Sequence, residues 1–111
     1  MFAAERAFEI SDYETAISRA YYACYHAIVR LLESRADIRR PRWDHVQLQS
    51  EFRRNFSSKG YLFSVRAARD LEELQASRLM ADYENRQSTP RQVEGLMARA
   101  RVLLSAVVEE A

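Results

Sequence analysis

The chain has 111 residues, of which 48% are hydrophobic and 30% charged, and its formal net charge is +1. This size allows one domain with one core, and the composition is that of a globular protein rather than a disordered chain or a polycation. Two glycines and two prolines are too few for the many turns of an all-β fold. We therefore expect a single all-α domain over residues 1–111.

Two helices are predicted in the first third of the chain. Residues 2–9 are compatible with a short helix, and a capping-box pattern, with Ser11 at the N-cap and Glu14 three residues later, starts a long helix over about 12–34. One face of this long helix is apolar at helical spacing: Ile17, Ala20, Tyr21, Cys24, Ile28 and Leu31. Residues 34–42 have no apolar period and contain a proline, so a loop is predicted there.

Two more helices are predicted in the middle of the chain. Asp44 can cap a helix over about 45–57, and Gly60 suits the left-handed position after a helix end. Its apolar positions are Val46, Leu48, Phe52 and Phe56. A third main helix covers about 64–84, and its apolar positions Ala67, Leu71 and Leu74 continue in phase to Arg78 and Ala81.

The last helix has the clearest start signal. After a polar turn at 85–88, Thr89 stands at the N-cap, Pro90 at the first helical position and Gln92 at the third. The helix runs to about 109, and its inner side is formed by Val93, Leu96, Met97, Ala100, Leu103, Leu104 and Val107. The predicted fold is an antiparallel up-and-down bundle of four main helices, with or without a short extra helix at the N-terminus.

Polar and aromatic groups interrupt the apolar character of the first long helix. Residues 18–27 read Ser-Arg-Ala-Tyr-Tyr-Ala-Cys-Tyr-His-Ala, and Arg19, Tyr22 and His26 share one stripe at spacings of three and seven residues. Such groups stand beside a core when partners satisfy them or when a site needs them. Both a structural and a functional interpretation of His26 therefore stay open.

A second polar pair stands on the predicted third main helix. Arg78 and Asp82 are four residues apart and can pair directly, and Arg78 continues the apolar stripe of Leu71 and Leu74. A pair in that phase lies at the edge of the core or in a groove, where charges need partners. The sequence leaves open whether it is a structural polar cluster or part of a functional groove.

Several site types are excluded or disfavoured. Cys24, His26 and His45 do not have the spacing of a tetrahedral zinc site, and no glycine-rich phosphate loop is present, so we expect neither a metal nor another cofactor. The single cysteine is expected to be a small buried hydrophobe. No apolar run reaches the length of a membrane span and no signal-peptide pattern opens the chain, so we expect no membrane and a cytoplasmic location.

Basic residues concentrate between residues 35 and 59. This segment holds seven basic residues (Arg35, Arg39, Arg40, Arg42, Arg53, Arg54 and Lys59) against three acidic ones (Asp37, Asp44 and Glu51). A local basic patch is compatible with this distribution. The loop from Arg39 to Trp43 could meet RNA phosphates, with Trp43 as a stacking face, or it could simply be solvated.

Taken together, the sequence resembles the HEPN domain family (higher eukaryotes and prokaryotes nucleotide-binding), in particular its small stand-alone prokaryotic branch. Three signatures carry the resemblance in chain order: Ser18-Arg19-Ala-Tyr21-Tyr22-Ala-x-x-His26-Ala27; His45 followed by Phe52 and Phe56; and Arg78-x-x-Ala81-Asp82-Tyr83. The first is quite specific and the third moderately so, and the match extends over about residues 12–109.

The resemblance implies a helical bundle that is commonly a homodimer. Many members of the family are metal-independent endoribonucleases whose active site pairs an arginine with a histidine a few residues later, contributed by both subunits at a dimer cleft. Several members are encoded beside a small nucleotidyltransferase and form toxin–antitoxin modules with it. In some of these modules the partner adenylylates a tyrosine just after the histidine.

This chain departs from the catalytic pattern of the family. Arg78 matches the family arginine, but Asp82 stands where the histidine is expected, with Tyr83 after it. A carboxyl group with an ordinary pKa near 4 is a poor general acid at neutral pH. The other arginine–histidine spacings of this kind, from Arg19 to His26 and from Arg40 to His45, do not lie on that helix.

We therefore predict an RNA- or nucleotide-linked role in a HEPN/nucleotidyltransferase system, with a homodimer and an RNA or nucleotide as further partners. The alternative is a non-catalytic dimeric interaction module whose polar cluster is structural, and whether the chain is an enzyme stays open. The candidate residues are Arg78, Asp82 and His26 for catalysis, Arg19, Tyr22, Arg78 and His45 for binding of nucleotide or RNA, and Tyr83 for modification.

Overall fold

A computed structural model describes residues 1–56, 63, 65–83 and 89–110, with the side chains of 65 and 80–83 outside the description. The helices in chain order are α1 (Phe2–Glu9), α2 (Tyr13–Arg35), α3 (His45–Phe56), α4 (Val65–Tyr83) and α5 (Pro90–Glu110). The predicted all-α class, the four main helices and the short N-terminal helix are confirmed. Gly60 and the predicted turn at 85–88 lie outside the described residues.

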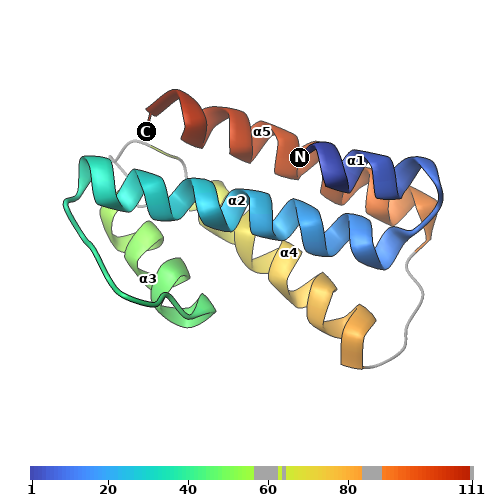
Figure 1. The fold of residues 1–111 in the computed structure, drawn as a ribbon, viewed down its shortest axis with the longest axis horizontal. Coiled ribbons are helices and arrows are strands. Elements are labelled where there is room, and N and C mark those ends of the chain that lie inside the picture. Colours follow the sequence, from blue (N-terminus) through green and yellow to red (C-terminus); the bar gives the residue numbers. More distant parts are fainter. Residues whose placement is uncertain (57–62, 64, 84–88, 111) are drawn as a thin grey trace.

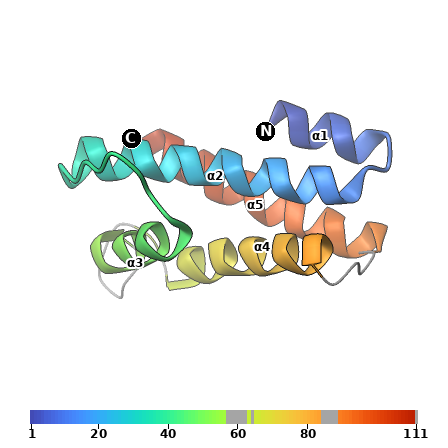
Figure 2. The same ribbon diagram turned by 60° about the horizontal axis from the view of Figure 1, so that its bottom comes forward.

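The long helix α2 is the centre of the bundle. It packs against each of the other four helices, whereas α1 packs mainly against α2 and reaches α5 through the Glu5–Arg101 ion pair at 2.7 Å. Figures 1 and 2 show α5 beside α2 and running in the same direction, while α4 runs in the opposite direction to both. Two contacts agree with this arrangement, because Cys24 reaches Ala100 near the middle of the two helices and Arg35 reaches Glu110 at their ends.

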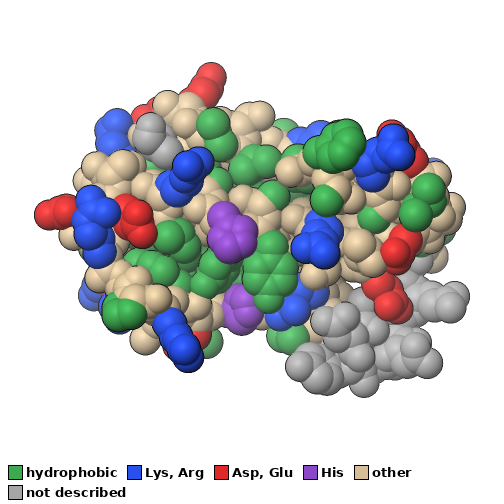
Figure 3. Space-filling model, in the orientation of Figure 1, with side chains coloured by type: hydrophobic (Ala, Val, Ile, Leu, Met, Phe, Trp, Pro, Cys, Tyr) green, Lys and Arg blue, Asp and Glu red, His purple; other side chains and the backbone are tan. Residues whose placement is uncertain are grey.

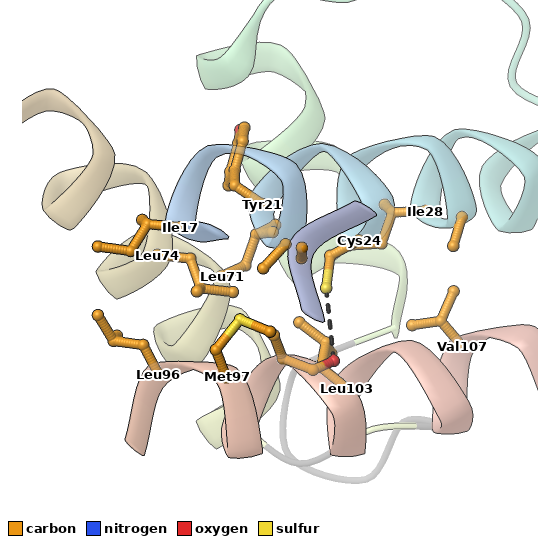
Figure 4. Close-up of a cluster of buried hydrophobic side chains, with 14 of the residues drawn as sticks. Ile17, Tyr21, Cys24, Ile28, Leu71, Leu74, Leu96, Met97, Leu103 and Val107 are labelled. Atoms are coloured by element: carbon orange, nitrogen blue, oxygen red, sulfur yellow. Dashed lines mark hydrogen bonds between the residues drawn. The ribbon is translucent and has the colours of Figure 1, made fainter. Parts of the chain in front are cut away.

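The core lies where α2, α4 and α5 meet (Figure 4). All six residues of the predicted apolar stripe of α2 are buried, from Ile17 to Leu31. Leu71 and Leu74 of α4 and Met97 of α5 close the same cluster. The prediction that Cys24 is a buried hydrophobe is also confirmed. The α3 stripe is confirmed at Leu48, Phe52 and Phe56, but Val46 is 78% exposed.

The predicted N-cap of the long helix is wrong by one residue. Asp12, not Ser11, caps α2, because its carboxylate accepts a hydrogen bond from the backbone N–H of Thr15 at 3.4 Å. Ser11 has φ 62°, and its N–H donates to the carbonyl of Phe8 while that of Asp12 donates to Ala7. This is the Schellman pattern of a helix end, so Ser11 terminates α1 and is not available to start α2.

The other two predicted caps are confirmed. Asp44 accepts from the N–H of Gln47 at 2.7 Å, and Gln47 accepts from the N–H of Asp44 at 3.4 Å. Thr89 and Gln92 make the same reciprocal pair at 3.2 and 3.0 Å. Each reciprocal pair satisfies two backbone donors and so fixes the first residue of its helix. None of the helices in the described part of the chain is long and apolar enough to cross a membrane.

Candidate functional site

Six side chains from three helices come together on one side of α2. Figure 3 shows histidine side chains (purple) in the middle of one face, among hydrophobic (green) and basic (blue) side chains. We call this group the aromatic–arginine cluster, and its members are Tyr21, Tyr22, Tyr25 and His26 of α2, His45 of α3 and Arg78 of α4. Tyr21 is buried, His26 is exposed, and the other four members are half-buried.

Two tyrosines hold the start of α3 against α2. The hydroxyl of Tyr21 lies 2.7 Å from Nδ1 of His45, and the hydroxyl of Tyr25 donates to the carbonyl of Trp43. The ring of His45 also packs on Tyr25, with 5.7 Å between the ring centroids. The Asp44 cap makes His45 the first residue of α3. The site is thus positioned by local helix-start chemistry together with the tyrosines of α2.

Arg78 enters the cluster from α4. Its guanidinium carbon lies 5.3 Å from the ring centroid of Tyr22 and 5.7 Å from that of Tyr21. Its Nε donates to the side-chain carbonyl of Gln75 at 3.0 Å. A guanidinium stacked on aromatic rings and anchored through Nε has a fixed orientation, and such stacking is worth about 0.5–2 kcal/mol.

His26 forms the outer edge of the cluster. Its ring meets Tyr25 edge-to-face, with the centroids 5.2 Å apart and the planes at 89°. Its ring centroid lies 6.2 Å from that of Tyr22. The rings of Tyr22 and Tyr25 contact both histidines and so connect His26 to His45.

Burial and charge set the protonation of the central pair. Burial raises the pKa of Tyr21 to about 12, and a hydrogen bond from Gln49 and the charge of Arg78 offset only part of that rise. Burial, followed by the positive charge of Arg78, lowers the pKa of His45, while Asp44 acts in the opposite sense. At neutral pH the Tyr21 hydroxyl is protonated and His45 is neutral; their hydrogen bond runs from the hydroxyl to Nδ1 when the ring proton is on Nε2, and from Nδ1 to the hydroxyl in the other tautomer.

The structure brings together four of the predicted site residues, namely Tyr22, His26, His45 and Arg78. Arg19 is exposed, and no hydrogen bond, ion pair or ring contact among the described residues links it to the cluster. The backbones of Asp82 and Tyr83 form the last turn of α4. Their side chains, and with them the predicted Arg78–Asp82 pair, lie outside the described residues.

The basic residues between 35 and 59 are largely paired with acidic ones. Arg40 lies over the ring of Trp43, 5.1 Å from its centroid, and reaches Glu51 at 3.9 Å. The further ion pairs in this segment join Arg35 to Glu110, Arg39 to Glu33 and Asp37, Arg53 to Glu72 and Arg54 to Glu51. The segment is therefore a network of surface ion pairs more than a continuous basic patch.

The sequence did not predict that Arg78 and His45 contact the same tyrosine rings. From the sequence, His45 is a candidate binding residue, and Arg78 is grouped with Asp82 and His26 as a candidate catalytic residue. The signal was present, because His45, Leu48 and Phe52 are spaced three and seven residues apart and therefore share the inner face of α3. Tyr21 was assigned to the core only, although its hydroxyl orients His45.

The cluster has the donors of an anion site and the ring faces of a stacking site. A guanidinium and an imidazole N–H can both bind phosphate oxygens, and tyrosine rings can stack on bases. Among the residues that the structure describes, no group of three or more histidine, cysteine, aspartate or glutamate side chains could hold a metal ion. The Arg78 guanidinium can therefore bind a phosphate, and the neutral imidazole of His45 can donate or accept a hydrogen bond.

The chain matches the sequence model of a known protein family. The sequence model of the HEPN domain matches residues 1–111. No curated protein matches the chain, and no solved structure does. HEPN domains are known to dimerise, and their roles are linked to nucleotides or RNA. Because the match covers the whole chain, this chain belongs to the HEPN domain family.

Proposed function

We propose that the aromatic–arginine cluster binds the phosphate and base of a nucleotide or of RNA. One observation carries this proposal: Arg78 of α4 and His45 of α3 both contact the rings of Tyr21 and Tyr22, and all of these side chains except Tyr21 are half-buried. A phosphate would accept from the guanidinium and from Nε2–H of His45, and a base would stack on a tyrosine ring.

Binding measurements on Arg78 variants test this proposal. The probes are a fluorescein-labelled uridine 12-mer and ATP, and the variants are Arg78→Ala and Arg78→Lys. Arg69→Ala is the matched control, because Arg69 is an exposed arginine of the same helix. Loss of a charge-assisted contact to phosphate should weaken binding about tenfold or more in Arg78→Ala. Lysine should restore binding only in part, because it lacks the planar guanidinium.

The alternative is a structural cluster, and the same variants distinguish it. In that case Arg78→Ala would lower the thermal midpoint sharply while neither probe binds the unmodified chain. Binding that survives in Arg78→Ala with an unchanged melting curve would contradict the proposed site. The structural alternative draws support from the burial of Tyr21 and from its bond to His45, which ties two helices together.

Ribonuclease activity is the second candidate function, and the presence of two histidines in one cluster with Arg78 favours it. Cleavage would require a base to take the proton of the ribose 2′-hydroxyl and an acid to protonate the leaving 5′-oxygen, with Arg78 stabilising the charged phosphorus centre. His26 is the candidate acid–base group, and Asp82 stands where the family places its histidine. Cleavage of RNA in EDTA that disappears in His26→Ala, with unchanged melting, would establish this activity.

A two-component system is the proposed context. A nucleotidyltransferase partner would transfer the AMP group of ATP to the hydroxyl of Tyr83, so that the new bond joins the phenolic oxygen to the α-phosphorus and pyrophosphate leaves. Co-expression with a nucleotidyltransferase encoded beside this chain, followed by intact-mass measurement, tests the transfer. The mass should rise by one adenylyl group in the unmodified chain and not in Tyr83→Phe, and sedimentation of the same samples tests the homodimer.

A further inference from the structure

A groove adjoins the aromatic–arginine cluster on the far side of His26. It is open, has a volume of about 770 Å³, and lies between the second half of α2, the C-terminal part of α5 and the first residue of the chain. The groove exists because α1 has 8 residues and α2 has 23, so α1 covers only part of the long helix (Figure 1). His26 lines this groove and also belongs to the cluster.

Apolar side chains form most of the groove surface. Its apolar members are Met1, Ala23, Ala27, Leu104 and Val108. Val108 is 59% exposed, although valine is a residue that usually lies inside. The two alanines are four residues apart on α2 and leave room above the helix. Apolar side chains around an open hollow suit a flat, weakly polar group such as a nucleobase.

Of the two arginines in the groove, Arg39 is paired with acidic side chains, and Arg30 has no such partner in the part of the chain that the structure describes. Arg39 reaches Glu33 at 3.6 Å and Asp37 at 3.8 Å, so the acidic side chain of the groove is neutralised. Arg30 is exposed and has no hydrogen bond, ion pair or ring contact with any residue that the structure describes. A guanidinium beside apolar surface can hold a backbone phosphate of a strand that is already bound at the cluster, while the adjoining base lies over the apolar side chains.

We propose that a single-stranded oligonucleotide runs from the aromatic–arginine cluster, past His26, into this groove, with a phosphate on Arg30 and a base over the apolar surface. This inference rests on the proposed function and names its substrate as a polynucleotide rather than a mononucleotide. Tyr22, His26 and Arg30 stand at successive turns of α2. The distance from Tyr22 to Arg30 along the helix is roughly 12 Å, which exceeds the ~3.4 Å rise of one nucleotide in a stacked strand.

Chain-length dependence of binding tests the inference. The probes are a labelled uridine 12-mer and uridine monophosphate, each measured against the unmodified chain and Arg30→Ala. Arg91→Ala is the matched control, because Arg91 is an exposed arginine of α5 that lies roughly 20 Å from Leu104 along the helix. Arg30→Ala should weaken the 12-mer about tenfold, lower the slope of log affinity against log salt by about 0.7, and leave the monophosphate unaffected.

A second variant tests the groove without changing its charge. Ala23 is half-buried at the groove surface, so Ala23→Trp fills the hollow and should weaken the 12-mer while the monophosphate still binds. Equal affinity for both probes, or a 12-mer affinity that is the same in Arg30→Ala and Arg91→Ala, would overturn the inference. A change in dimer dissociation in either groove variant would also overturn it, because the groove would then belong to a contact between copies of the chain.

The two proposals fail in different ways. If the cluster binds nucleotides but the groove does not, Arg78→Ala weakens both probes and Arg30→Ala weakens neither. If the proposed function itself is wrong, the unmodified chain binds neither probe, or Arg78→Ala binds both as tightly as the unmodified chain does.

Discussion

The hydroxyl of Tyr21 and Nδ1 of His45 lie 2.7 Å apart, and their hydrogen bond joins the middle of α2 to the first residue of α3. Tyr21 has no exposed surface, so water does not reach its hydroxyl. The same contact helps to fix the orientation of His45, whose pKa is lowered by burial and then by the charge of Arg78. The Tyr21–His45 pair therefore both holds α3 against α2 and orients His45, and variants of each residue can separate these two roles.

Tyr21→Phe removes only the hydroxyl of this pair. Loss of the hydrogen bond, with Nδ1 of His45 left without its partner, should lower the free energy of unfolding by about 1–2 kcal/mol. Urea denaturation followed by circular dichroism measures this change. Tyr13→Phe is the matched control, because the Tyr13 hydroxyl makes an exposed 3.5 Å contact with Ser11, and its removal should cost less than about 0.5 kcal/mol. Equal stability of the two variants would contradict the structural importance of the Tyr21–His45 bond.

The lowered pKa of His45 predicts a dependence of stability on pH. In the unfolded chain the histidine pKa is about 6.5, and in the folded chain it is lower because of burial and then Arg78. As the pH falls through this interval the unfolded chain binds more protons, so the free energy of unfolding decreases. The contribution of neutral His45 to the free energy of unfolding is fully present above the histidine pKa of the unfolded chain. It is lost as the pH falls through the lower pKa of the folded chain. Between about pH 7.5 and 5 the urea midpoint should therefore fall more steeply for the unmodified chain than for His45→Gln. Equal slopes of the urea midpoint against pH in the two proteins would contradict this prediction.

Asp44 has two separable roles at the start of α3. It caps the helix through the N–H of Gln47 at 2.7 Å, and its negative charge raises the pKa of His45 against the larger opposing effects. Asp44→Ala should cost about 1 kcal/mol of stability and lower the His45 pKa further, whereas Asp44→Asn keeps most of the cap and removes only the charge. Nuclear magnetic resonance titration of the His45 ring protons, together with urea denaturation, measures both effects. A His45 pKa that is the same in Asp44→Asn as in the unmodified chain would show that the charge does not reach the ring.

Most of the fold could be predicted because its signals are local. Helix periodicity placed the apolar stripes from Ile17 to Leu31 and from Val93 to Val107, and the reciprocal caps at Asp44 and Thr89 fixed two helix starts. The misassigned cap at Ser11 shows the limit of a local pattern. A serine one residue before an aspartate can either start a helix or end the preceding one, and the short α1 decides the matter by requiring a left-handed residue at its end.

The candidate site was harder to predict because it depends on how helices pack. His45 and Arg78 are far apart in the sequence, and only the way α3 and α4 lie against α2 brings both onto the same tyrosines. No periodicity within one helix contains that information. The groove beside His26 likewise depends on two features of the fold. The difference in length between α1 and α2 can be predicted from the sequence, but the direction in which α5 runs cannot.

The thiol of Cys24 is predicted to be unreactive while the chain is folded. Cys24 has no exposed surface, burial raises its pKa to about 12, and its Sγ donates to the carbonyl of Ala100 at 3.6 Å. Because the thiolate is the nucleophile, only on the order of one thiol in 10⁴ is ionised at about pH 8. Ellman's reagent should therefore react slowly with the folded chain and rapidly in urea, and the denaturant concentration at which the rate rises should match that of unfolding by circular dichroism. Rapid reaction in the absence of denaturant would mean that α2 and α5 separate readily at this contact, and the core described between them would then be wrong.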